Sequence, residues 1–190
     1  IRLIHNKNFL TQVQNYNHAL RQICSESKYC KIVQADDWIF PECIAKMVEV
    51  AEANPSVGIV GSYSIAGEKV WNCGLSYKKD FFRGHEVCKK ALLDNQHYFG
   101  SPTSIMLRSR IIRLRDPFYI ENHPYEDTDL CYDVLQEWDF GFVHQILSYI
   151  RTQNNSILFN AHAFDPHYLD KFLTISKYGR IYLDSQEFNN

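Results

Sequence analysis

Asp36 and Asp37 are adjacent carboxylates at the end of an apolar stretch, in the run K-I-V-Q-A-D-D-W-I-F-P of residues 31–41. Pro41 is typical of the first residue of a helix, so the pair is expected between a strand and a helix. In an open α/β sheet, ligands bind at the carboxyl ends of the strands. Two carboxylates placed there could bind a hard cation or a sugar hydroxyl. The alternative is that Asp37 simply caps or precedes the next helix while Asp36 is solvated, because helix starts favour Asp.

A second acidic pair, Glu126 and Asp127, opens the stretch Y-E-D-T-D-L-C-Y-D-V-L-Q-E-W of residues 125–138. Apolar residues at helical spacing predict a helix there, and acids in a first turn interact favourably with the helix dipole. A third candidate is the tight polar segment F-G-S-P, with Gly100 and Ser101, before an expected strand. The sequence contains no Walker A loop, G-x-G-x-x-G or G-x-S-x-G motif, so phosphate binding or serine catalysis by those routes is unsupported.

The elements expected to position these residues alternate along the first third of the chain. We predict strands at 1–5, 29–33 and 57–64, separated by helices at 11–25 and 41–54. This order is typical of a parallel sheet with helices on its faces. Further strands are expected at 70–77, 103–107 and 139–151, and further helices at 84–94, 109–114, 125–138 and 165–178. The fold class expected is α/β with a mostly parallel sheet.

Length and composition indicate an ordinary globular chain. Its 190 residues with 45% hydrophobic content suit a single domain, and a formal charge of -2 gives no sign of nucleic-acid binding. We find no apolar stretch of membrane-spanning length and no signal peptide. The six scattered cysteines form no C-x-x-C pair and no Cys/His spacing typical of zinc, and we expect most of them to be buried small hydrophobes in a reducing compartment. We expect a cytoplasmic location, with the inner face of the membrane as an option, and the oligomeric state stays open.

The order of these segments resembles the inverting nucleotide-sugar glycosyltransferases of family 2, which have the GT-A fold. The resemblance is carried by NYNHAL (15–20), VQADDWIFPECI (33–44), FGSPTSIMLRS (99–109), YEDTDLCYDVLQEWDFGFV (125–143) and YIRTQNNS (149–156). It implies one Rossmann-like GT-A domain over residues 1–190. Within it we expect the remainder of a nucleotide-binding half at 1–64, an acceptor-side half at 65–160 and a C-terminal helical extension at 161–190.

The resemblance also implies a role for each candidate residue. Asp36 would be the main ligand of a Mg²⁺ or Mn²⁺ ion, with Asp37 assisting, and the ion would stabilise the leaving nucleoside diphosphate. Asp127 would remove the proton of the acceptor hydroxyl, and Glu126 would contact the acceptor or orient the loop. The partners implied are a nucleotide-diphosphate sugar and a saccharide, lipid-linked or protein acceptor. The substrate-binding residues implied are Asn17, Gln34, Gly100, Ser101, His123, Arg151 and Gln153.

Three departures from the family pattern motivate an alternative. Gln34 and Gln153 stand where the family carries Asp and His, so both positions hold neutral amides. Residues 1–5 would correspond to the family's third strand, so the resemblance implies about sixty residues before them, a figure based on one strand-helix-strand unit of about thirty residues plus a further helix. The alternative is therefore a non-catalytic or truncated GT-A-like binding module. A metal-dependent phosphohydrolase has little support, because no second carboxylate cluster follows a strand.

For several aromatic side chains we favour a structural explanation over a functional one. Trp38 and Trp138 are predicted as core residues rather than sugar platforms. Tyr98 and Phe99, directly before Gly100, are predicted to be buried.

Overall fold

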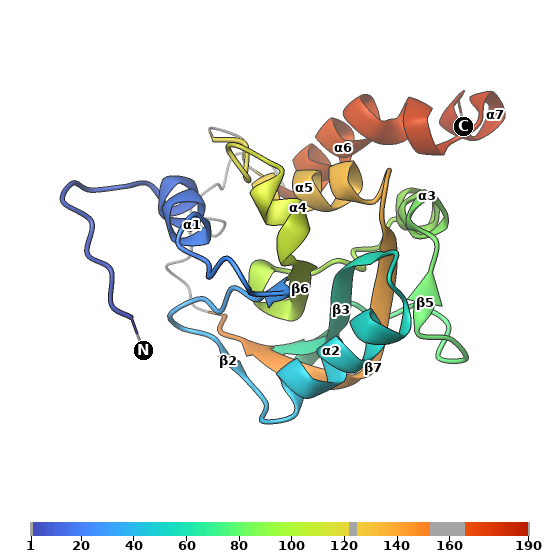
Figure 1. The fold of residues 1–190 in the computed structure, drawn as a ribbon. Coiled ribbons are helices and arrows are strands. Elements are labelled where there is room, and N and C mark those ends of the chain that lie inside the picture. The colour runs from blue at the N-terminus through green and yellow to red at the C-terminus, as the bar shows by residue number, and fades with distance from the viewer. Residues whose placement is uncertain (1, 122–124, 153–165, 190) are drawn as a thin grey trace.

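The computed structural model describes residues 2–121, 125–152 and 166–189. These residues form an α/β fold in which helices cover both faces of a curved sheet (Figure 1), as the alternating pattern predicted. No helix in the described part of the chain combines the length and the apolar character needed to cross a bilayer.

The described strands and helices are the following. The strands are β1 (Tyr29–Cys30), β2 (Trp38–Ile39), β3 (Val57–Ala66), β4 (Lys69–Trp71), β5 (Phe81–Phe82), β6 (Ile105–Arg108) and β7 (Asp139–Ile150). The helices are α1 (Gln12–Leu20), α2 (Cys43–Ala53), α3 (Gly84–Asp94), α4 (Ser109–Arg113), α5 (Glu126–Val134), α6 (Pro166–Tyr182) and α7 (Ser185–Asn189), with a short 3-10 helix, η1 (Pro102–Ser104).

The strand pairing shows a mixed sheet, whereas the sequence predicted a mostly parallel one. The strand order is β1-β6-β3-β7-β2, with β4 beside β3 and β5 beside β7. Among the described strands only β3 and β7 pair in parallel, and the other pairs are antiparallel. β1 and β3 do run in the same direction, as expected for a strand-helix-strand unit. They are not neighbours, because β6 arrives from later in the chain and lies between them, antiparallel to both.

The first forty residues contain less regular structure than predicted. Residues 2–5 are exposed and form no strand. The helix begins where expected because Thr11 forms a capping box with Gln14: the Thr11 hydroxyl accepts from the Gln14 N–H, and the Gln14 side chain accepts from the Thr11 N–H. It ends at Leu20 rather than at residue 25. The strand expected at 29–33 is limited to β1, whose two residues pair with Leu107 and Arg108 of β6.

The two faces of the sheet are covered by different helices. α2 packs against one face, where its Met47 and Val50 join Val60 and Leu147 in a separate apolar core. The other face carries the larger core, which includes residues of α3, α4, α5 and α6 together with Phe140 of β7. In Figure 1, α2 lies in front of the sheet and α5 lies directly below α6. The acidic pair at the start of α5 therefore belongs to a helix packed in the larger core.

The C-terminal half follows the predicted order of elements, with several differences in their bounds. The strand expected at 70–77 is limited to β4, and the helix expected at 125–138 ends at Val134. α3 occupies the predicted range 84–94. The residues expected to form one or two strands at 139–151 form the single long strand β7, whose pairing with β3 shifts register after Val143. α6 continues to Tyr182, four residues beyond the predicted end at 178. The division into halves at residue 64 stays a prediction.

Gly84 offers a test of how α3 packs against the end of α5. A Cβ atom at Gly84 would lie 2.1 Å from the Trp138 carbonyl oxygen and 2.2 Å from that of Leu135, and backbone atoms cannot rotate away. We expect Gly84→Ala to lower the free energy of unfolding by about 3 kcal/mol, the upper range for overpacking. Urea unfolding would measure this loss. The exposed neighbour Glu86, changed to Ala, serves as the control and should cost less than about 0.5 kcal/mol. Equal stability of the two variants would contradict the packing described.

Candidate active site

Asp36 and Asp37 lie in the turn between β1 and β2, and their side chains differ in what they contact. Asp37 is held at both carboxylate oxygens: the Thr103 hydroxyl donates to Oδ2 at 2.6 Å and the Arg151 backbone N–H donates to Oδ1 at 2.9 Å. Asp36 is exposed, and no hydrogen bond joins its carboxylate to the described residues. Asp37 therefore fixes the turn, whereas Asp36 presents its carboxylate to solvent. The alternative that Asp37 caps the next helix is wrong, because β2 separates it from α2.

The segment around Gly100 packs against this turn. Gly100 has φ +64°, and a Cβ atom there would lie 2.3 Å from the Ser104 Oγ and 2.6 Å from the Asn72 amide nitrogen. Only glycine therefore fits. The partly buried ammonium of Lys31 donates to the carbonyl oxygens of Thr103 (2.6 Å) and Ile105 (3.1 Å), and burial lowers the pKa of Lys31 to about 8. These contacts fix Thr103 where its hydroxyl can reach Asp37.

Glu126 and Asp127 form the first turn of α5. The Asp127 Oδ1 accepts from the Thr128 N–H at 2.8 Å. The pKa of Asp127 is raised to about 6, first by burial and then by the neighbouring carboxylate of Glu126, while the Thr128 N–H opposes the shift. A carboxyl with a pKa near neutrality accepts and releases protons easily at pH 7, which is the property needed in a general base.

α1 connects the aspartate turn with the acidic pair. The Gln34 amide donates to the Tyr16 hydroxyl at 2.7 Å, and the Gln34 backbone N–H donates to the Thr103 hydroxyl at 3.2 Å. The pKa of Tyr16 is raised, first by burial, and the carboxylates of Glu126 and Asp127 contribute to the increase. Tyr16 is therefore close to both acidic sites, and the two sites belong to one region of the protein.

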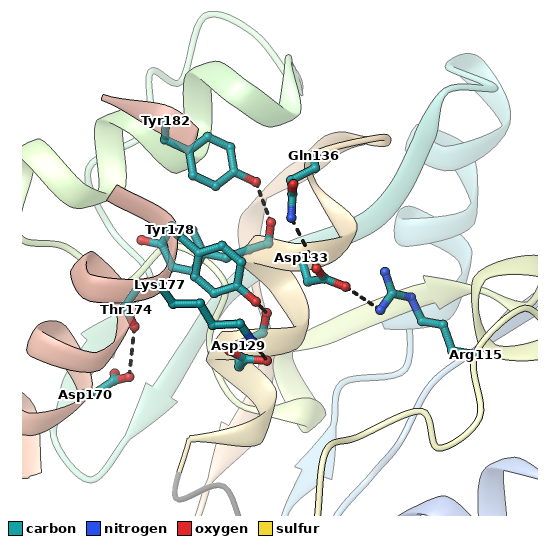
Figure 2. A network of polar contacts seen from close by, with 10 residues as sticks. Arg115, Asp129, Asp133, Gln136, Asp170, Thr174, Lys177, Tyr178 and Tyr182 are labelled. Carbon is teal, nitrogen blue, oxygen red and sulfur yellow. Dashed lines mark hydrogen bonds and ion pairs between the residues drawn. The ribbon is translucent and has the colours of Figure 1, made fainter. Parts of the chain in front are cut away.

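α6 holds α5 through polar contacts, which Figure 2 shows. The Lys177 ammonium donates to both carboxylate oxygens of Asp129, at 2.7 and 2.9 Å. The hydroxyls of Tyr178 and Tyr182 donate to the backbone carbonyls of Asp129 and Tyr132. Asp129 lies two residues after Asp127, so α6 fixes the turn that carries the candidate base.

The described residues provide only part of a metal site. Across 2–121, 125–152 and 166–189, no group of three or more His, Cys, Asp or Glu side chains is arranged to hold an ion. Asp36 and Asp37 supply carboxylate oxygens, which suit Mg²⁺ or Mn²⁺. Mg²⁺ in phosphoryl-substrate sites is commonly bound by one or two carboxylates plus substrate phosphates and waters. The donor set of the turn fits that arrangement.

Comparison with known proteins decides the family. Residues 1–115 match the model of glycosyl transferase family 2, a range that covers more than half of the chain. The chain belongs to glycosyl transferase family 2. The match includes the aspartate turn and Gly100 but ends before Glu126. A search of curated proteins gives no match.

Solved structures show the same fold as this family 2 chain. The structure of Staphylococcus aureus TarS 1-349 with UDP is 15% identical, with a TM-score of 0.52, and the match covers 90% of this chain and 54% of that one. The complex of the same TarS fragment with UDP-GlcNAc is 12% identical, with a TM-score of 0.55, and the match covers 90% and 56%. The GT-A fold implied by the sequence is thereby confirmed. The chain spans about half the length of these structures.

Several predicted substrate-binding residues of this family 2 chain contact protein groups. The buried amide of Asn17 donates to the Tyr119 carbonyl at 2.9 Å and accepts from the Tyr119 N–H at 2.8 Å. The Gln34 amide contacts Tyr16, and Arg151 reaches Asp37 through its backbone. Ser101 follows Gly100, and its buried hydroxyl has no hydrogen-bond partner among the described residues. The substrate-binding roles stay predictions, and His123 and Gln153 lie outside the described residues.

The predictions for aromatic residues have mixed outcomes. Tyr98 and Phe99 are buried, as predicted, and Trp138 packs against the larger core. The prediction that Trp38 is a core residue is wrong: half of its surface is exposed, and its ring stacks on Tyr149 at a centroid distance of 3.9 Å. Trp38 lies on the edge strand β2, which has no neighbour on its outer side among the described strands.

Three residues at the site escaped the sequence analysis. Thr103 bonds Asp37, Lys31 fixes Thr103, and Tyr16 contacts Gln34. Lys31 carried a signal, because a lysine within an apolar stretch is expected to be buried and paired. Tyr16 and Thr103 carried none, since an aromatic on a helix face and a threonine before a strand are common in any core.

The contact between Lys177 and Asp129 predicts that α6 stabilises the site. We expect Lys177→Met to lower the free energy of unfolding by about 1–3 kcal/mol, because the buried Asp129 carboxylate would lose a charged donor. Thermal or urea unfolding would measure the loss. Lys90→Met is the matched control: it removes an exposed pair with Asp94 and should cost less than about 0.5 kcal/mol. An equal loss of unfolding free energy in both variants would show that the burial of Asp129 does not strengthen its ion pair with Lys177.

The raised pKa of Asp127 predicts how stability depends on pH. The folded state binds the Asp127 proton more tightly than the unfolded chain, whose Asp pKa is about 3.9. Ionised Asp127 therefore destabilises the fold at pH 7, and this cost disappears as the pH falls from about 6 to about 4. We expect Asp127→Asn to be more stable than wild type at pH 7 and equal to it below pH 4, in urea unfolding across this range. Glu137→Gln, at an exposed position, controls for the change in net charge.

Proposed function

We propose that this family 2 chain forms the catalytic part of a transferase that moves a sugar, with inversion, from a nucleotide-diphosphate sugar to an acceptor hydroxyl. The observation that carries the proposal is the series of hydrogen bonds from Asp37 through Thr103 and Gln34 to Tyr16. This series joins an exposed carboxylate turn, suited to a cation and a diphosphate, to Tyr16, whose pKa the carboxylates of Glu126 and Asp127 help to raise. The TarS structures with UDP and UDP-GlcNAc make UDP-sugars the first donors to test.

In the proposed reaction, Asp127 is the general base. Inversion requires the acceptor hydroxyl to attack the anomeric carbon from the side opposite the leaving diphosphate, and its proton must leave during the attack. Asp127 accepts that proton. With a pKa of about 6 it is ionised at pH 7, yet it binds a proton more strongly than an ordinary aspartate. Glu126 contacts the acceptor and keeps negative charge beside the base.

The donor diphosphate would lie at the aspartate turn. Asp36 would be the main ligand of Mg²⁺ or Mn²⁺, and Asp37, already held at both oxygens, would assist it. A bound ion would neutralise charge on the leaving diphosphate. Arg151, beside Asp37, would add a positive charge, and Gly100 and Ser101 would lie against the donor sugar.

The remaining partners follow from the reaction. The acceptor would be a hydroxyl of a saccharide, a lipid-linked molecule or a protein, and a nucleotide-sugar donor fits a cytoplasmic location, including the inner face of the membrane. The alternative of a non-catalytic binding module predicts donor binding without turnover, or no donor binding.

The test uses the full-length protein and two readouts. Calorimetric titration with UDP- and GDP-sugars in the presence of Mn²⁺ should show binding of one donor class, and product analysis should show transfer of its sugar. Asp127→Asn should bind the donor within about twofold of wild type and lose transfer by about 10²–10⁴-fold, the contribution typical of a general base. The kcat/KM of wild type should fall as the pH decreases below about 6, because protonated Asp127 cannot accept a proton.

Each part of the proposal has an outcome that would contradict it. If the Asp127→Asn variant transfers sugar at the normal rate, Asp127 is not the general base. If donor binding is the same after Asp36→Asn, or after removal of the divalent ion, the aspartate turn does not bind a metal ion. If no donor binds under any condition, the non-catalytic module is the correct interpretation.

A further inference from the structure

A cavity lies between α3, α5 and α6, and we call it the α3–α6 cavity. Its volume is about 300 Å³, counting the space that is open to solvent, which is at the small end of the range for ligand pockets. Leu92 and Tyr132 give it some apolar surface. Its main polar lining residues are Asn95, Gln96, His97, Thr128, Asp170 and Lys171.

Two of the segments that line the cavity lead directly to residues of the candidate site. Thr128 follows Asp127 in α5, and its backbone N–H donates to the Asp127 carboxylate at 2.8 Å. His97 lies three residues before Gly100, on the segment that runs from α3 to η1. A ligand in the cavity would therefore contact the same turn of α5 that carries Asp127.

Asp170 is the buried charged group of the cavity. Only 7% of its side chain is exposed, and its Oδ2 lies 3.5 Å from the Nε2 of His97. The Thr174 hydroxyl, one turn further along α6, donates to its Oδ1 at 3.4 Å, as Figure 2 shows. A carboxylate offers about four acceptor positions and no donor, so it can bind hydroxyl groups in addition to these two long contacts.

The chemistry of the lining distinguishes between kinds of acceptor. The Thr128 hydroxyl and the Gln96 amide can both donate and accept, as sugar hydroxyls do, and the apolar surface of Leu92 suits the C–H face of a sugar ring. A lipid chain would place apolar groups against the buried carboxylate of Asp170, and an anionic group would meet its like charge. The lining therefore fits an uncharged sugar best.

We propose that the α3–α6 cavity binds an uncharged sugar of the acceptor through its hydroxyl groups, with Asp170 and Thr128 as acceptor-binding residues. The bound sugar is held against the first turn of α5, so that the attacking hydroxyl of the acceptor is delivered to Asp127. This inference rests on the proposed function, and it selects the saccharide among the acceptor classes named there.

The test uses the full-length protein and uncharged methyl glycosides as probes. Saturation-transfer NMR with the methyl glycosides of glucose, galactose, mannose and N-acetylglucosamine should show that at least one of them binds. The glycoside that binds most tightly then serves as the acceptor in transfer assays with the nucleotide sugar that binds. The 6-phosphate of the same sugar and octanol represent the anionic and the lipid alternatives, and both should bind more weakly than the glycoside.

Asp170→Asn and Thr128→Val remove the two proposed contacts with little change in size. Asp170→Asn should raise the glycoside Kd and the acceptor KM about tenfold or more, the effect of one hydrogen bond to a charged group, and Thr128→Val about threefold, that of a neutral one. Valine keeps the backbone N–H that donates to Asp127, so kcat and the donor Kd of Thr128→Val should stay within about twofold of wild type.

A blocking variant and two controls complete the set. Gln96→Trp puts a large ring at an exposed lining residue and should prevent glycoside binding, which keeps the test valid if Asp170→Asn does not fold. Gln186→Trp, at an exposed position of α7, is its matched control. Asp80→Asn removes a carboxylate at an exposed position and should leave the glycoside Kd and the acceptor KM unchanged.

The outcomes separate this inference from the proposed function. If wild type transfers sugar and the three cavity variants keep a normal glycoside Kd and acceptor KM, the inference is overturned and the proposed function stands. Binding of none of the glycosides by wild type would also overturn it, as would tighter binding of the 6-phosphate, because Lys171 rather than Asp170 would then select the ligand. If wild type binds no nucleotide sugar and transfers none, the proposed function fails, and the acceptor role of the cavity fails with it.

Discussion

The carboxylate of Asp37 is the contact on which the arrangement of the site depends. Its two oxygens bind a hydroxyl of η1 and a backbone N–H just beyond the end of β7, so one side chain joins three segments that are far apart in sequence. Charge-assisted hydrogen bonds of this kind are stronger than neutral ones. With Asp37 used in this way, its neighbour Asp36 is the carboxylate left facing solvent.

The other acidic pair is held by different means. Partial burial and the neighbouring carboxylate of Glu126 raise the pKa of Asp127, an arrangement that costs stability and is typical of functional sites. The contacts of α6 with α5 offset this cost, since Lys177 neutralises Asp129 and two tyrosines satisfy backbone carbonyls. A C-terminal helix that seemed peripheral in the sequence thus fixes the position of the candidate base.

Between the two acidic sites, α1 acts as a connector. One of its faces contacts the aspartate turn through Tyr16, and Asn17 in the next position holds the backbone at Tyr119. The capping box at Thr11 fixes where this helix begins, and therefore which residues face the site. The family match and the GT-A fold agree with the catalytic role proposed for this region.

The sequence by itself determined the α/β class, the family and the ranges of several elements. Local signals suffice for these: the periodicity of α3, the apolar run of β3 and the acidic first turn of α5 are properties of short segments. The order of motifs was enough to place Asp36, Asp37, Glu126 and Asp127 in one family pattern.

Only the tertiary structure decided the strand order, the different roles of Asp36 and Asp37, and the partner of Gln34. Each depends on contacts between distant segments: β6 enters between β1 and β3, Thr103 reaches Asp37, and Tyr16 reaches Gln34. The raised pKa of Asp127 and the exposure of Trp38 were also decided by the tertiary structure, because the packing of distant segments sets how far each side chain is buried. A residue type fixes what hydrogen bonds a side chain can form, but the packing of distant elements fixes which of them it forms.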